Sequence, residues 1–171
     1  MATNRSDPLC EAFREDHAVL GRGFHELSTL LRGRDTEGAR IVAERVDSEA
    51  GAHIAFEEEH FYPTLARLQG AEAVEPLYAE HAVGLEVVRS LCEAKPGAPW
   101  SAAACMELLG KSEIMERHIA DCGTLFGAMA SLAEPERARL LNALNALRRE
   151  RPRWSRYAQG KAAKGARAER P

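Results

Sequence analysis

Histidine and glutamate side chains recur in this sequence at the spacing of a helical face. His53, Glu57 and His60 follow one another at intervals of four and three residues, which places all three on one side of a helix. Imidazole together with carboxylate suits iron, zinc, copper or manganese. The sequence has no multi-thiolate cluster, which argues against a structural zinc site. We therefore predict a metal site, with iron as the preferred ion.

Single histidines elsewhere in the chain extend this pattern. His17, His81 and His118 each fall within the apolar stripe of a predicted helix. A single inward histidine is more often a hydrogen-bonded core residue than a ligand. Several imidazoles and a carboxylate at one level of a core would each need a partner, however, and a metal ion satisfies them all at once. His25 lies about 80° round its helix from His17, so we expect it at the surface or behind the ligands.

Five helices are predicted to position these residues. Apolar residues recur three or four positions apart, and no stretch alternates as a strand would. Proline and glycine interrupt the pattern, as in the connector at 95–99, and Pro63 is expected to kink the second helix. The expected helices cover about residues 8–32, 36–68, 71–94, 101–131 and 134–149. The predicted fold is all-α, an up-down-up-down four-helix bundle with a short fifth C-terminal helix.

The antiparallel order of such a bundle brings the candidate ligands to one level. Counted from the helix ends that share one end of the bundle, they fall within about two helical turns of each other. They are His17, His53, Glu57, His81 and His118, with His60 and Cys122 in the same layer.

Composition bounds the class of protein. The 171 residues are 45% hydrophobic and 29% charged, which suits one compact domain. A net charge of -3 provides no positive field for nucleic acid or an anionic membrane, and no apolar run approaches the length of a membrane span. We expect a cytoplasmic protein whose four cysteines are reduced thiols. Residues 1–151 are expected to form the domain, and the basic segment 152–171, which lacks an apolar period, a disordered tail.

The order and spacing of these residues resemble those of the hemerythrin-like HHE cation-binding domain, over about residues 9–150. The most specific part is His53-Ile-Ala-Phe-Glu57-Glu58, followed by aromatic residues and Pro63. The resemblance implies a non-haem iron site, commonly two irons bridged by carboxylates and an oxygen species. The implied ligands are His17, His53, Glu57, His81 and His118.

Two positions depart from the pattern of that family. Cys122 stands on the fourth helix where members usually repeat a carboxylate, and Leu77 stands where oxygen-carrying members have a further histidine. Three outcomes remain open: Asp121 turns in as the carboxylate, His60 fills a vacancy, or the site holds a single iron. Cys122 is either a thiolate ligand or a small buried hydrophobic residue.

The resemblance leads us to expect a non-haem iron protein that binds or reacts with O2, NO or peroxide, for sensing, storage or detoxification. Its cofactor would be a di-iron or mononuclear iron centre, and its partner a small diatomic or peroxide molecule. An alternative is a regulatory or partner-binding helical module with a degenerate or structural metal site. A redox enzyme that uses Cys122 beside iron is a third hypothesis. The sequence leaves open whether the protein is an enzyme and whether it forms a homo-oligomer.

Overall fold

The computed structural model describes residues 7–121 and 123–168, with side chains up to residue 163. Every regular element in these residues is a helix, which confirms the predicted all-α class. The elements are α1 (Pro8–Arg32), α2 (Thr36–Phe56), the π-helix η1 (Glu57–Phe61), α3 (Tyr62–Gln69), the short η2 (Ala71–Ala73), α4 (Glu75–Cys92), α5 (Ala102–Ala120), α6 (Gly123–Ser131), α7 (Glu134–Glu150) and α8 (Trp154–Ala168). None of these helices combines the length and the apolar composition that crossing a membrane requires.

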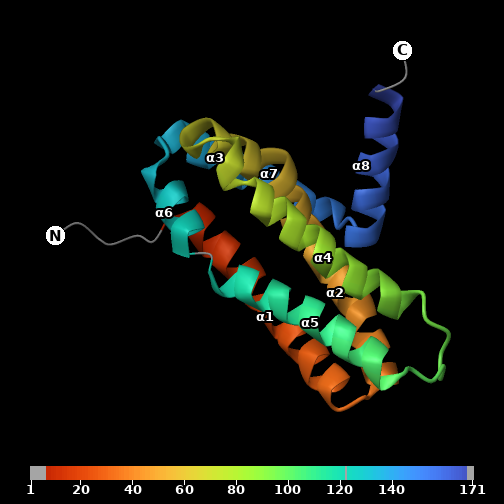
Figure 1. Ribbon diagram of the computed structural model, residues 1–171. Coiled ribbons are helices and arrows are strands. Elements are labelled where there is room, and N and C mark those ends of the chain that lie inside the picture. Colours follow the sequence, from red (N-terminus) through yellow and green to blue (C-terminus); the bar gives the residue numbers. More distant parts are fainter. Residues whose placement is uncertain (1–6, 122, 169–171) are drawn as a thin grey trace.

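Four helices form the body of the molecule. Both α1 and α4 pack along α2 and α5, so the four enclose a common interior (Figure 1). α3 and α6 lie near one end of this bundle, α7 packs against α2, and α8 projects from the side (Figure 1). The expected set of four long helices and one short fifth is therefore too simple, because the second and fourth segments divide and α8 follows α7.

The main helices begin at polar caps that the sequence contains. The carboxylate of Asp7 accepts hydrogen bonds from the amides of Leu9 and Cys10, with proline at the start of α1. Asp35 caps α2 and Ser101 caps α5 in the same way. Each cap satisfies amides that a helix start leaves without an intrahelical partner, so α1, α2 and α5 start at defined residues.

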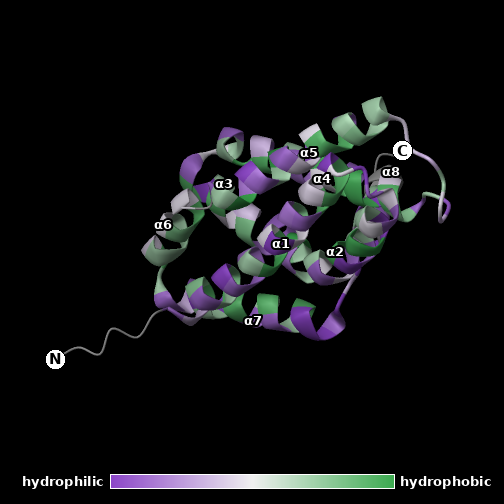
Figure 2. Cartoon of the chain, turned by 90° about the horizontal axis from the view of Figure 1, so that it is seen from below, coloured by the Kyte–Doolittle hydropathy of each residue, from purple (hydrophilic) through white to green (hydrophobic). Residues whose placement is uncertain are grey.

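Apolar side chains form two clusters with a polar layer between them. The first cluster contains Leu20 and the second contains Phe13, and His17 lies between these two residues on α1. On α4, His81 likewise lies between Tyr78, which packs against the second cluster, and Leu85 of the first. Figure 2 shows hydrophobic and hydrophilic residues interspersed along the helices, as amphipathic helices require. The polar layer is therefore enclosed at both ends by packed hydrocarbon.

A π-helical turn replaces the simple kink expected at Pro63. The amide of Tyr62 donates to the carbonyl oxygen of Glu57, five residues earlier, and Pro63 lies in the first turn of α3. Proline lacks an amide hydrogen and collides with the carbonyl four residues before it in a regular α-helix. The wider turn accommodates this restriction directly before α3.

The segment expected to be a disordered tail contains a packed helix. Trp154, at the start of α8, is 1% exposed and belongs to the first apolar cluster. The amide and hydroxyl of Ser155 donate to the carboxylate of Asp47 on α2, at 2.7 and 2.9 Å. The prediction of disorder is therefore wrong for α8, because one large aromatic side chain and a buried cap replace the apolar period that the segment lacks.

Candidate metal centre

Five of the predicted ligands come together in the bundle interior as two groups. In each group the candidate ligand atoms lie within 4.8 Å of one another, and all five side chains are buried. His17, His53 and Glu57 form the first group, and Glu57, His81 and His118 form the second. Each group therefore has two imidazoles and one carboxylate, and the carboxylate of Glu57 belongs to both.

The first group is assembled from α1 and from the end of α2. The Nδ1 of His17 donates to the carbonyl oxygen of Phe13 at 3.2 Å, which leaves its Nε2 to face the interior. The Nε2 of His53 lies 3.4 Å from Oε2 of Glu57. The Nδ1 of His53 faces Asp16 on α1, at 3.5 Å from Oδ2. Both imidazoles therefore direct Nε2 toward the carboxylate.

The second group is assembled from α4 and α5. The Nε2 of His81 lies 3.2 Å from Oε2 of Glu57 and 3.2 Å from Nε2 of His118. The Nδ1 of His81 donates to Oε1 of Glu58 at 3.1 Å, and that of His118 donates to Oε2 of Glu80 at 2.7 Å. An acceptor on Nδ1 fixes the ring and leaves the Nε2 lone pair available, which is the usual arrangement around a metal-binding histidine.

The charges in this layer are strongly coupled. Burial opposes ionisation of Glu57, but its contacts with His53 and His81 outweigh that effect and hold the pKa of its carboxyl well below the usual range. Burial also opposes protonation of His53, yet Glu57 and Asp16 raise its pKa to about 9. For His17, burial and the nearby charge of His53 lower the pKa to about 4. The layer thus contains an ionised carboxylate, and without metal the protonated ring of His53 supplies its counter-charge.

Unpartnered polar atoms test whether a metal ion fits this layer. The Nε2 of His17, both ring nitrogens of His53 and both carboxylate oxygens of Glu57 are buried without a hydrogen bond. A buried polar atom without a partner costs about 1–3 kcal/mol. Nitrogen and oxygen donors that converge in this way are ligands for a metal ion, so the residues fit one.

Three carboxylates behind the histidines were not identified from the sequence. Asp16, Glu58 and Glu80 each stand next to a predicted ligand of their own helix, and each contacts the histidine of another helix. The available signal was the acidic residue adjacent to each ligand, as in Asp16-His17. Helical periodicity describes one helix face and not the reach to another helix, so it does not predict these contacts.

Comparison with known proteins adds a decisive observation to this geometry. The sequence matches the hemerythrin HHE cation binding domain over residues 9–130. The chain belongs to this family. No curated protein and no solved structure matches the chain significantly. The matched region of the hemerythrin HHE domain contains both groups of candidate ligands and ends within α6, so α7 and α8 lie outside it.

Two of the residues proposed to replace the missing hemerythrin ligands, His60 and Asp121, do not join either group. His60 is half-buried on η1, where its ring centroid lies 6.5 Å from that of Phe56. Asp121 is exposed at the end of α5, and Leu77 packs against the second apolar cluster. Cys122 lies outside the described residues. His25 is exposed, as expected.

Tyr62 occupies a position beside the second group that the sequence did not reveal. Its buried hydroxyl lies 3.1 Å from Nε2 of His81, on the side where that histidine faces His118 and Glu57. Burial, followed by the negative charge of Glu57, raises the pKa of the Tyr62 phenol well above its usual value. The phenol is therefore protonated and can donate a hydrogen bond within the hemerythrin site.

Proposed function

We propose that this hemerythrin HHE domain is a non-haem iron protein that binds or reacts with O2, NO or peroxide in its interior. The observation that carries the proposal is the pair of groups that share Glu57, each with two histidines and one carboxylate. Two histidines and one carboxylate with open positions form the ligand set typical of non-haem Fe(II) sites. The shared carboxylate supports a bridged pair of ions over a single one.

The side chains around the two groups favour small ligands. Bound iron would supply open coordination positions and redox chemistry for O2, NO or peroxide. Phe13 and Phe56, which are fully buried, help to enclose the layer and exclude water from it. Tyr62 would donate a hydrogen bond to a small molecule held near His81.

The unpartnered atoms disfavour the alternative of an empty or purely structural site. Without metal, Glu57 and His53 would remain a buried ion pair at 3.4 Å in which neither side chain has a hydrogen bond. A buried ion pair whose atoms lack hydrogen bonds does not recover the cost of desolvating its two charges. Retaining them is consistent with a site that is completed by a metal ion.

The proposal is tested by loading the purified chain with Fe2+ under nitrogen, removing unbound metal and recording absorption spectra on addition of NO, or of azide after the bound iron has been oxidised to Fe3+ with ferricyanide. We expect bound iron and a new charge-transfer band with the native sequence. His17→Ala should lose iron, whereas His25→Ala, which changes an exposed histidine of the same helix, should not. Native protein that retains no iron, or iron that produces no spectral response to either ligand, would refute the proposal.

A further inference from the structure

A cation from α7 contacts the carboxylate behind the first group of ligands. Arg148 donates from Nη2 to Oδ1 of Asp16 at 2.6 Å and from Nε to Oδ2 at 3.2 Å. The same Nη2 also donates to the carbonyl oxygen of Ala12 at 2.7 Å. Oδ2 of Asp16 in turn lies 3.5 Å from Nδ1 of His53. One chain of contacts thus runs from α7 to a ligand of the first group.

A cation from α8 contacts the carboxylate behind the second group. Lys161 donates from Nζ to Oε2 of Glu58 at 2.7 Å, and the hydroxyl of Tyr157 donates to the same oxygen at 3.2 Å. The other oxygen of Glu58 accepts from Nδ1 of His81 at 3.1 Å. One oxygen of the Glu58 carboxylate therefore contacts the candidate ligand His81, and the other contacts α8.

The remaining two histidines are supported differently. His17 uses the carbonyl oxygen of Phe13, which belongs to its own helix. His118 uses Glu80, and among the described side chains no cation of α7 or α8 bonds to that carboxylate. Each group therefore contains one histidine that is connected to a C-terminal cation and one that is not. Because both cations follow residue 130, neither lies in the region that matches the family.

We propose that the two C-terminal helices tune the two metal positions separately, Arg148 through Asp16 and His53, and Lys161 through Glu58 and His81. This inference rests on the proposed iron function. Arg148 and Lys161 act as positioning residues, because neither touches a candidate ligand atom. Each cation holds a carboxylate in place and draws negative charge from the oxygen that faces the imidazole, which sets the orientation and donor strength of that histidine.

Because each cation contacts a different carboxylate, removal of one cation should affect only one of the two metal positions. Removing a partner directly behind a metal-binding histidine typically weakens metal binding about 10–100-fold. Lys161 and Arg148 lie one hydrogen bond further from the metal than the carboxylates do. We therefore expect removal of either side chain to speed iron release from one position about threefold to tenfold. Release becomes faster because the carboxylate, once freed from the cation, no longer holds the imidazole in the orientation that the metal requires.

The experiment compares release of Fe2+ to a ferrous chelator from native protein, Lys161→Met and Arg148→Met, all loaded under nitrogen. We expect Lys161→Met to accelerate release of one iron and Arg148→Met to accelerate release of the other. Lys161→Arg retains the charge and should restore the native rate. Arg156→Met on α8 and Arg149→Met on α7 change exposed arginines and should leave both irons at the native rate.

A double-variant comparison separates tuning from general loosening of the fold. Glu58→Gln weakens the connection between α8 and His81, so adding Lys161→Met to it should produce little further change in release. Additive effects, equal acceleration of both irons, or release unchanged in both single variants would overturn the inference while native iron binding stands. Native protein that binds no iron would instead refute the proposed function, and this inference with it.

Discussion

Glu57 is the residue on which the proposed centre depends, because it is the carboxylate common to both groups. It is fully buried, and its two oxygens have no hydrogen-bond partner. Its nearest charged groups are the Nε2 atoms of His81 and His53, at 3.2 and 3.4 Å, and buried donors that converge in this way suit a metal ion. The neighbouring glutamates differ from Glu57 in their surroundings: Glu58 bonds to His81 and α8, and Glu59 is exposed.

Glu57→Gln should remove iron from both positions at once. The amide has nearly the same shape but no charge, so we expect affinity for Fe2+ to fall by more than about 100-fold, beyond the loss typical of residues behind a ligand. Iron content after desalting is the measurement. Glu59→Gln, at an exposed neighbouring position, is the matched control and should bind iron normally. Full iron content in Glu57→Gln would show that the carboxylate is not a shared ligand.

Tyr62→Phe should weaken binding of the small-molecule ligand and leave the metal content unchanged. The hydroxyl lies near Nε2 of His81, where it would donate to a molecule bound at the second position. A lost hydrogen bond of about 1–1.5 kcal/mol corresponds to about five- to thirteenfold faster dissociation of azide or NO. Stopped-flow dissociation rates provide the measurement. An unchanged rate with unchanged iron content would remove Tyr62 from the ligand pocket.

At the residue scale the sequence indicated the convergent ligands but not the residues that support them. His53 and Glu57 could be recognised because they are four residues apart on one helix. Glu58, Tyr62 and Lys161 could not, since their roles depend on a π-turn and on a helix that docks from a distant part of the chain. Periodicity predicts which face of a helix is buried and does not predict which side chains cross to another helix.

At the scale of elements, the link between α7 and α8 is fitted closely to α2. A Cβ added at Gly51 would lie 1.8 Å from the carbonyl oxygen of Pro152 and 2.7 Å from the amide of Trp154. Glycine at this position lets the two backbones approach, which brings Trp154 into the core and Lys161 to Glu58. Because the obstructing atoms belong to the backbone, a side chain at residue 51 would displace the whole link.

Gly51→Ala should therefore detach α8 from the bundle. We expect it to lower the free energy of unfolding by about 1–3 kcal/mol, the usual result of overpacking, and to expose the link after Pro152 to protease. Gly110→Ala on α5 is the matched control, because nothing lies within 4 Å of the added Cβ and alanine favours a helix by about 0.5–1 kcal/mol. Urea unfolding measures both. Equal stability of the two variants would contradict the close fit of this link.

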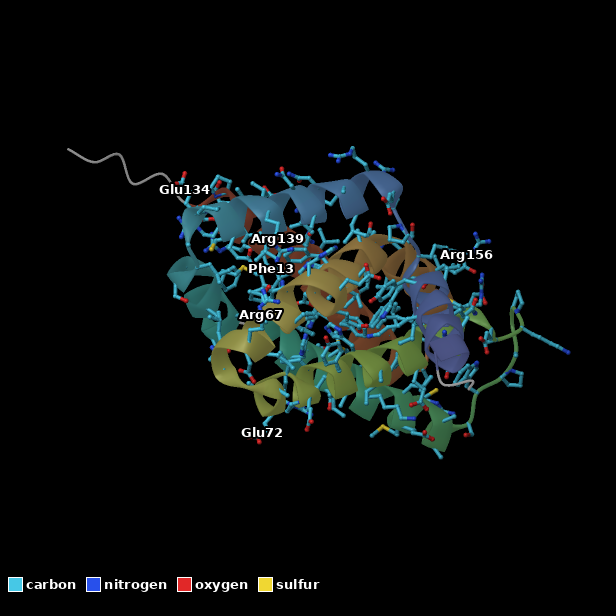
Figure 3. The ribbon with its side chains drawn as sticks, turned by 90° about the horizontal axis from the view of Figure 1, so that it is seen from above. Phe13, Arg67, Glu72, Glu134, Arg139 and Arg156 are labelled. Atoms are coloured by element: carbon cyan, nitrogen blue, oxygen red, sulfur yellow. The ribbon has the colours of Figure 1, made fainter. Side chains whose placement is uncertain are left out.

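The other element-scale contact is polar and joins α3 to α7. Arg67 of α3, labelled in Figure 3, donates to Oε1 of Glu136 on α7 at 3.2 Å, and Arg139 of α7 itself donates to the same oxygen at 2.8 Å. The contact between α3 and α7 could not be predicted from the sequence. Neither could the docking of α8, because its composition of lysine, arginine, alanine and glycine resembles a mobile tail.

At the scale of the whole molecule, the polar layer divides the core into two apolar clusters. Ligands from α1, α2, α4 and α5, together with Glu57 at the start of η1, meet in this layer. A metal ion bound there would connect the four bundle helices, and α7 and α8 would reach it from outside through Asp16 and Glu58. The family match covers the bundle, whereas the two C-terminal helices lie outside the matched residues.

An anaerobic titration of the metal-free chain with Fe2+, followed by desalting and metal analysis, tests the central claim most directly. Two groups that share Glu57 predict a break at two iron ions per chain. They also predict that iron-loaded protein unfolds at a higher temperature than metal-free protein, because only the folded state binds the ions. A break at one ion per chain, or no binding at all, would contradict the shared-carboxylate centre.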